Sequence, residues 1–381
     1  MDYDVYLKKM RENRNALLEY LDDEQNTDEL FENINKYFND QKIFEDPHFF
    51  KETITLISCI ANNHHRNEHF FNKIDRILSS FKSEILKIFS NYEIYTIFRK
   101  NHRIVFFLLN EKVIKPDVSI FANLTSKMYK KAYYPHYFSP EFKVLFEKKE
   151  YLRQELSQRM AKLPPSGAPI ERNSEKFEKK RKVAENDEKV CQLIREDSIE
   201  KFEMYVNKVN LSLSSTVGSS IFETNAFLIN KNPTLIQYAA FFGSLKIFNY
   251  LIENGIELDP SLWLYAIHSR NLDLIHILEN HKIIPEDETY KECLLESIRC
   301  HHSNVTKYIL NDILKNQNID KKAIVAQSIR YYNYEYFPDQ MSVDFDIFYD
   351  LCKYDYYSIV KLFLNGNLNL NQTKILIQFF E

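Results

Sequence analysis

Residues 232–259 read NPTLIQYAAFFGSLKIFNYLIENGIELD. Thr234 stands where a helix cap belongs, because its hydroxyl can accept a hydrogen bond from the first helical turn. Ala239 and Ala240 then place small side chains on this first helix. Gly243 follows at the turn, where glycine adopts conformations that other residues avoid. The stretch therefore predicts a helix that begins at a cap and ends at a tight turn.

A second helix follows the turn, with its apolar residues on one face. That face holds Ile247, Phe248, Leu251 and Ile252. Gly255 offers a left-handed stop after it. One helix pair cannot bury an apolar face of this size alone, so the unit needs stacked neighbours. We interpret the stretch as one helix-turn-helix repeat unit.

Sequences with the same apolar spacing lie before and after this unit. They occupy residues 191–211, 262–281, 293–312, 324–337 and 350–370. In this frame Ala266 replaces one of the two alanines, Asp197 stands where Gly243 stands, and the copy at 324–337 is degenerate. About six units exceed the three or so that a stable stack needs, so we expect an all-α fold with an α-solenoid.

The unit resembles the ankyrin repeat. TLIQYAAFFG (234–243) is similar to its T-P-L-H-x-A-A-x-x-G core, with Leu235 in place of proline and Gln237 in place of histidine. IFNYLIENG (247–255) is similar to its I-V-x-x-L-L-x-x-G segment. The resemblance implies an ankyrin-like solenoid. Because ELDPS (257–261) leaves little room for a projecting hairpin, we expect short fingers.

A closer resemblance involves the phrases SLWLYAIHS (261–269) and CHHSNV (300–305). Together with a helical first half and a charged linker, they are similar to a large ankyrin-containing family of uncharacterised proteins expanded in a parasitic flagellate. The resemblance covers residues 185–381 and reaches only vaguely into the first half. It implies a fold and a general role, and it supplies no specific activity.

The first half also has the three- and four-residue apolar spacing of amphipathic helices. Examples are residues 53–61, 70–81 and 103–112. The stretch at 95–117 is either a diverged repeat or an ordinary amphipathic hairpin. We expect a helical N-terminal region at residues 1–162 that includes possible diverged repeats.

The stretch AKLPPSGAPIERNSEKFEKKRK (161–182) contains three prolines and little apolar periodicity, which is typical of a domain boundary. We expect a charged, proline-containing linker at residues 163–183 and the repeat solenoid at residues 184–381. A Ser-rich insert at residues 211–232 is either an extended loop or a linker that shields the first helix pair.

Composition argues against several classes of function. The 381 residues include only five glycines, so the glycine-rich loops that cradle phosphates are absent. The net charge of -4 and the absence of a basic stripe predict no nucleic-acid or membrane binding. The five cysteines are scattered, which suits reduced thiols. We expect no cofactor and no small-molecule substrate.

Two groups of residues could hold a metal. His65, Glu68 and His69 spell H-x-x-E-H, a pattern used by one class of zinc peptidases. Such a site needs both histidines on one helix, yet the apolar pattern stops before this stretch and resumes after it, with Asn67 placed to cap the next helix. The motif is therefore predicted to straddle a turn.

The second group lies in the repeats and comprises Cys293, Cys300, His301 and His302. Its C-x6-C-H-H spacing is not that of a zinc finger, and the repeat frame places the two histidines at a turn. No catalytic residue and no metal ligand is assigned. The alternative is a metal-dependent hydrolase with its activity in the N-terminal half and the repeats as a targeting arm.

The sequence predicts a protein-interaction module or scaffold that binds an unidentified protein partner on a concave solenoid surface. The predicted partner-binding residues are Tyr238, Phe241, Phe242, Tyr265, His268, Arg270, His301 and His302. Each aromatic residue has the alternative of packing between repeats. A purely structural member of an assembly, which would self-associate, is a third interpretation.

The expected location is the cytoplasm. The first residues, MDYDVYLKKM, carry acidic side chains and no apolar signal region. A nuclear location through the basic run Lys179, Lys180, Arg181 and Lys182 is the alternative.

Overall fold

The computed structural model describes residues 2–125, 175–229, 231–339 and 345–365, with positions 137, 138, 140, 141, 147, 150, 151 and 154. Within this part of the chain the regular structure is helical, apart from an isolated bridge between Thr216 and Thr234. The predicted all-α class is confirmed. Among these residues no helix combines the length and the apolar character needed to cross a membrane.

The chain divides into two compact units. Unit 1 combines Met1–Ile60, Arg66–Ile77 and Tyr290–Glu381, and unit 2 combines Ala61–His65 and Leu78–Thr289. Unit 1 therefore draws on both the first helices and the last helix pairs of the chain.

Unit 1 contains helices from both ends of the sequence. They are α1 (Tyr3–Asp22), α2 (Asp28–Asp40), most of α3 (Pro47–Asn63) and of α4 (Phe70–Ser80), α19 (Lys291–Arg299), α20 (Ser303–Tyr308), α21 (Lys321–Tyr331), α22 (Phe345–Lys353) and α23 (Tyr357–Asn365), with a π turn η1 (Ile309–Ile313) and a 3-10 turn η2 (Tyr334–Tyr336). Helix α1 begins at Asp2, whose carboxylate accepts a hydrogen bond from the Val5 amide at 2.9 Å. It packs against α2 and against η2, so an N-terminal helix and a C-terminal turn share one core.

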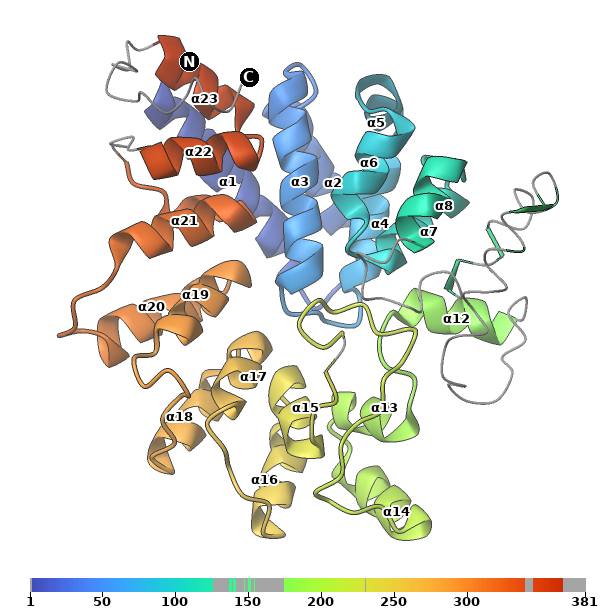
Figure 1. Cartoon of the computed structure of the whole chain (residues 1–381), viewed down its shortest axis with the longest axis vertical. Helices are drawn as coiled ribbons and strands as arrows, with labels where there is room; N and C mark the ends of the chain where they lie inside the picture. The colour runs from blue at the N-terminus through green and yellow to red at the C-terminus, as the bar shows by residue number, and fades with distance from the viewer. Residues whose placement is uncertain are drawn as a thin grey trace. The chain divides into compact units, whose positions relative to one another are not determined.

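Unit 2 contains the middle of the chain. Its helices are α5 (Lys82–Ile88), α6 (Asn91–Phe98), α7 (His102–Asn110), α8 (Val118–Thr125), α12 (Glu175–Val183), α13 (Lys189–Arg195), α14 (Ile199–Val209), α15 (Leu235–Phe242), α16 (Leu245–Glu253), α17 (Leu262–Ser269) and α18 (Leu272–Asn280). Helices α13, α15 and α17 lie side by side, and each is followed by a second helix that packs on it (Figure 1). We call α13, α15 and α17 the inner helices.

The same backbone turn joins the two helices of each pair. One residue of the turn has a left-handed conformation in every case: Asp197, Gly243, Arg270, His301, Tyr332 and Asp355. The next amide usually bonds back into the preceding helix, as from Ser244 to the Ala239 carbonyl at 3.0 Å and from His302 to the Ser297 carbonyl at 3.0 Å. The positions that align in sequence therefore also align in backbone conformation.

Two predicted segments differ from regular helix pairs. In the degenerate copy at 324–337, the 3-10 turn η2 stands where the other copies have a second helix. Of the predicted linker, residues 163–174 lie outside the described residues, and residues 175–183 form helix α12.

Candidate functional site

Helix α15 has the local structure that its sequence favours. The Thr234 hydroxyl accepts a hydrogen bond from the Gln237 amide at 3.3 Å, and the Gln237 side chain accepts one from the Thr234 amide at 2.9 Å. This reciprocal capping box satisfies two amides that the first turn leaves without helical partners. Gly243 ends the helix with a φ of 72°.

The other residues assigned a structural role in the repeats are mostly buried. Ala239 and Ala240 lie on α15 and Ala266 lies on α17, the helix that packs against it. Leu251 is fully buried on α16, and Gly255 follows that helix with a φ of 83°. Small side chains on α15 and α17 allow the two inner helices to pack closely.

Most of the predicted partner-binding residues are covered. Those that are buried are Tyr238, Phe241, Tyr265, His268, His301 and His302. Phe242 and Arg270 are half-buried, and Arg270 occupies the left-handed position that ends α17. The sequence left open the alternative that the aromatic residues pack between repeats. The buried aromatic residues have surroundings of that kind.

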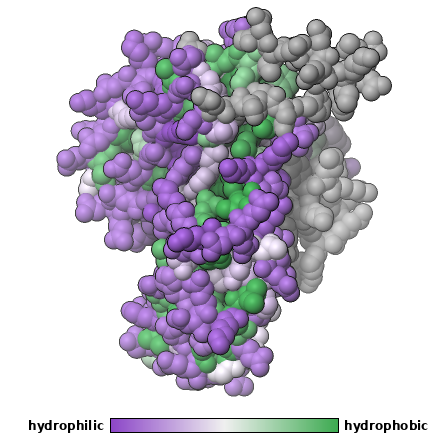
Figure 2. Space-filling model, turned by 90° about the vertical axis from the view of Figure 1, so that its left-hand side faces the viewer, coloured by the Kyte–Doolittle hydropathy of each residue, from purple (hydrophilic) through white to green (hydrophobic). Residues whose placement is uncertain are grey.

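Figure 2 shows how apolar residues are distributed over one face of the described part of the chain. Hydrophilic residues cover most of that face, and hydrophobic residues form smaller areas between them. The exposed large apolar side chains of unit 2 are spread over separate helices and loops, for example Leu86, Met204 and Ile284. On the inner helices and their turns, Phe242 and Arg270 are the predicted binding residues that keep partial exposure.

An aromatic cluster covers the inner helices α15 and α17. The ring of Phe227, from the Ser-rich insert, lies 5.8 Å from Phe241, 5.0 Å from Tyr265 and 4.2 Å from His268 between centroids. The Lys231 ammonium lies 3.3 Å from the centre of the Phe227 ring. The insert therefore contributes a side chain that is packed against three of the predicted binding residues.

Tyr238 belongs to a neighbouring polar group between α13 and α15. Its hydroxyl accepts a hydrogen bond from the Arg195 guanidinium at 2.6 Å, and its ring lies 4.8 Å from that of Phe242. Burial raises the pKa of the Tyr238 phenol well above its usual value, although Arg195 opposes the shift. Tyr238 therefore stays protonated and joins α13 to α15.

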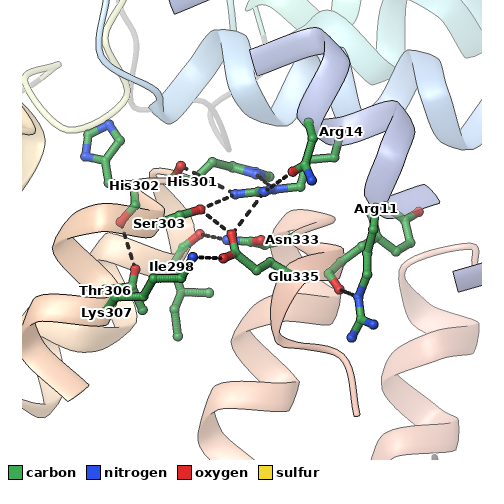
Figure 3. A network of polar contacts seen from close by, with 12 residues as sticks. Arg11, Arg14, Ile298, His301, His302, Ser303, Thr306, Lys307, Asn333 and Glu335 are labelled. Atoms are coloured by element: carbon green, nitrogen blue, oxygen red, sulfur yellow. Dashed lines mark hydrogen bonds and ion pairs between the residues drawn. The ribbon is translucent and has the colours of Figure 1, made fainter. Parts of the chain in front are cut away.

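His301 belongs to a buried network in unit 1 (Figure 3). Arg14 on α1 donates from Nε to His301 Nδ1 at 3.1 Å, and its Nη1 lies 3.1 Å from a carboxylate oxygen of Glu335. Because a guanidinium can only donate, His301 Nδ1 must accept, so Nε2 carries the proton and donates to the Tyr331 carbonyl at 2.9 Å. Both ring nitrogens of His301 are thereby occupied by protein groups.

The neighbours of His301 also have structural surroundings. His302 is fully buried at the start of α20, and its carbonyl accepts a hydrogen bond from the Thr306 hydroxyl at 3.0 Å. Cys293 and Cys300 are buried, and burial raises the pKa of the Cys300 thiol well above its usual value.

The H-x-x-E-H pattern falls between two helices, as the sequence predicts. Helix α3 ends at Asn63 and α4 begins at Phe70, so His65, Glu68 and His69 lie on the connecting segment. The Asn67 side chain accepts a hydrogen bond from the His69 amide at 3.0 Å. Because α4 begins at Phe70, this bond lies in the turn before the helix, and its donor is not an amide of the first helical turn.

Sequence reasoning missed three buried or covered side chains: Arg14, Glu52 and Phe227. Glu52 is 2% exposed in unit 1 and accepts hydrogen bonds from the Tyr6 and Tyr334 hydroxyls, the latter at 3.2 Å. A signal existed for one of the three, because Arg14 occupies a position on the apolar face of α1.

Comparisons with protein-family models, with curated proteins and with solved structures find no match to this chain.

Proposed function

We propose that this chain is a non-catalytic protein-interaction module made of ankyrin-like helix pairs. The observation that carries the proposal is the recurring left-handed turn at aligned positions, from Asp197 to Asp355. A unit that repeats in sequence and in backbone conformation, with the first helices of neighbouring pairs in contact within each compact unit, is typical of helical repeat proteins. Such proteins present a continuous surface for partners.

One contact between neighbouring pairs supports the stacking. Gln237, which stands where the ankyrin motif has histidine, donates from Nε2 to the Ser261 hydroxyl at 2.8 Å. Ser261 is the residue before α17, so the side chain that caps one pair also reaches the next. Polar contacts of this kind fix the register between adjacent units.

The partner would be a protein, bound through the accessible part of the inner-helix surface. Phe242 and Arg270 are the predicted binding residues that keep partial exposure, and the two side chains offer an aromatic ring and a cation. Aromatic residues and arginine contribute disproportionately to binding at protein interfaces.

Affinity capture with the full chain as bait tests the proposal. The full chain is needed because unit 1 contains residues from both ends of the sequence. We expect a near-stoichiometric protein that the unaltered bait retains and a Phe242→Ala, Arg270→Ala bait loses. A control bait carries Lys246→Ala and Asn249→Ala on exposed positions of α16 and should retain the partner.

Equal retention by all three baits, or an empty capture from folded baits, would count against the proposed surface. Circular dichroism of each bait establishes that it is folded.

We place this module in the cytoplasm. The basic run that could direct nuclear import lies on α12, and its Arg181 is 1% exposed. The Arg181 guanidinium donates to the Glu141 carboxylate at 2.7 Å and to the Tyr137 carbonyl at 3.1 Å. A buried arginine is not available to an import receptor, which leaves three lysines in the run.

A further inference from the structure

The Phe227 ring occupies a site on the inner helices that is lined by aromatic side chains. It is stacked on Phe241 with an interplanar angle of 15°, meets Tyr265 edge-on at 84°, and is 8% exposed. His268 forms another wall, at 4.2 Å between ring centroids. An aromatic side chain held among aromatic neighbours has the form of an interface anchor.

A cation accompanies this ring. The Lys231 ammonium lies 3.3 Å from the Phe227 centroid and 5.4 Å from the Tyr265 centroid, while the residue as a whole is exposed. Lysine four positions after phenylalanine thus places its ammonium over the aromatic face.

The insert that supplies Phe227 is fastened elsewhere. Its earlier residues bond to the segment before α13: the Gly218 carbonyl accepts from Asn186 at 2.8 Å, and Thr224 donates to the Ala184 carbonyl at 2.8 Å. Around Phe227 the backbone bonds are local, as from the Ile229 amide to the Asn225 carbonyl at 2.9 Å. The insert is fastened after Phe227 as well, since the Val217 amide donates to the Pro233 carbonyl at 2.7 Å and the Ser219 hydroxyl donates to the Asn232 side chain at 3.0 Å. Phe227 thus lies in a short stretch between two anchored ends.

The insert is also longer than a connection between helix pairs requires. The next pair is reached through Asn254–Ser261 alone, whereas the insert and its flanks extend from Asn210 to Thr234. Long loops inside compact domains are usually functional.

We propose that the pocket formed by Phe241, Tyr265 and His268 is a docking site for an extended segment of a partner protein. The segment would carry an aromatic residue and, four positions later, a lysine or arginine. Phe227 and Lys231 of this chain are its internal occupants, and a partner must displace them. This inference rests on the proposed interaction function and specifies the chemistry of the partner.

The test uses a fluorescent peptide with the sequence of residues 222–233, FETNAFLINKNP, and the full chain carrying Phe227→Ala. We expect the peptide to bind saturably to this emptied pocket, and fluorescence anisotropy measures the binding. The unaltered chain should bind the peptide at least about tenfold more weakly, because its own segment occupies the site for most of the time. A peptide with Phe227→Ala should not bind.

A second protein variant covers the case in which Phe227→Ala fails to fold. Lys231→Ala changes an exposed residue, and it should raise peptide affinity above that of the unaltered chain because it loosens the internal occupant. Hydrogen exchange around Phe227 should accelerate in this variant, while exchange on α15 should not.

Two outcomes would overturn the inference. One is a folded Phe227→Ala or Lys231→Ala chain that binds the native and the alanine peptide equally. The other is a stable dimer by light scattering that Phe227→Ala dissociates, which would make a second copy of this chain the occupant. Peptide binding together with an empty affinity capture would support the docking pocket and count against the proposed function.

Capture of a partner through Phe242 and Arg270 without peptide binding would support the proposed function and count against the docking pocket.

Discussion

Arg14 is a charged residue at an apolar position of an N-terminal helix. It is 1% exposed, and its guanidinium contacts His301, Ser303 and Glu335, all from the last helix pairs. Burial lowers its pKa, and the Glu335 carboxylate opposes that shift. A buried charge is tolerated only when its partners replace water. The burial of Arg14 therefore requires His301, Ser303 and Glu335 to stay in contact with it.

We therefore expect Arg14→Ala to lower the free energy of unfolding by about 3 kcal/mol, because Glu335 and His301 lose their donor in a buried setting. Chemical denaturation of the full chain measures the change. Lys8→Ala is a matched control on the same helix, since the Lys8 side chain is 78% exposed and its pair with Glu12 should contribute under about 0.5 kcal/mol. Equal effects of the two substitutions would contradict the proposed role of Arg14.

Glu52 makes the stability of unit 1 depend on pH. Burial raises the pKa of its carboxyl from 4.5 to about 7, while the hydroxyls of Tyr6 and Tyr334 oppose the shift. Because the folded state holds the proton more tightly, this stabilisation is complete below pH 4.5 and is lost as pH rises to about 7. The difference corresponds to about 3 kcal/mol.

Glu52→Gln should remove this dependence. The variant should lose less stability than the unaltered chain between pH 5 and pH 8, because its amide does not ionise in the buried site. Urea denaturation at several pH values within this window measures the two slopes. Parallel slopes would mean that Glu52 does not titrate there.

At the scale of the helix pair, the turn conformation is preserved while its residue changes. Gly243 has a φ of 72°, but Arg270, His301 and Tyr332 adopt the same left-handed region at aligned positions. We expect Gly243→Val to cost about 2 kcal/mol, since a β-branched residue is strained there, and Gly243→Asn to cost less than about 1 kcal/mol. Thermal unfolding of the two variants compares them, and equal losses would locate the cost in packing against Ser269 and Asn271, the nearest contacts of an added Cβ.

The helices could be predicted because their signals are local. The apolar spacing and the cap at Thr234 depend on residues within a few positions, and α15 begins where these signals place it. The packing of Phe227 against Tyr265 and His268 could not be predicted. No periodic pattern specifies which surface an irregular insert will cover, and Phe227 is one of 29 phenylalanines in the chain.

At the scale of the whole molecule, sequence order and compact units do not coincide. The apolar pattern divides the chain at a proline-containing stretch, yet Tyr6 and Arg14 share a core with Tyr334 and Glu335. Contacts between residues so distant in sequence leave no trace in local spacing. Arg14 is the exception, because a charge on an apolar helical face calls for a buried partner.

This organisation predicts how a fragment behaves. A chain of residues 184–381 lacks Tyr6, Arg14 and Glu52, so its last helix pairs lose their buried polar partners from α1 and α3. We expect backbone amides of α19, α21 and α22 to exchange with solvent faster than in the full chain, while those of α15 and α17 change less because their mutual packing is retained. Hydrogen exchange followed by mass spectrometry compares the two proteins. If α19–α22 kept full protection in the fragment, the C-terminal pairs would be stable alone, and the network around Arg14 would only attach the N-terminal helices to them.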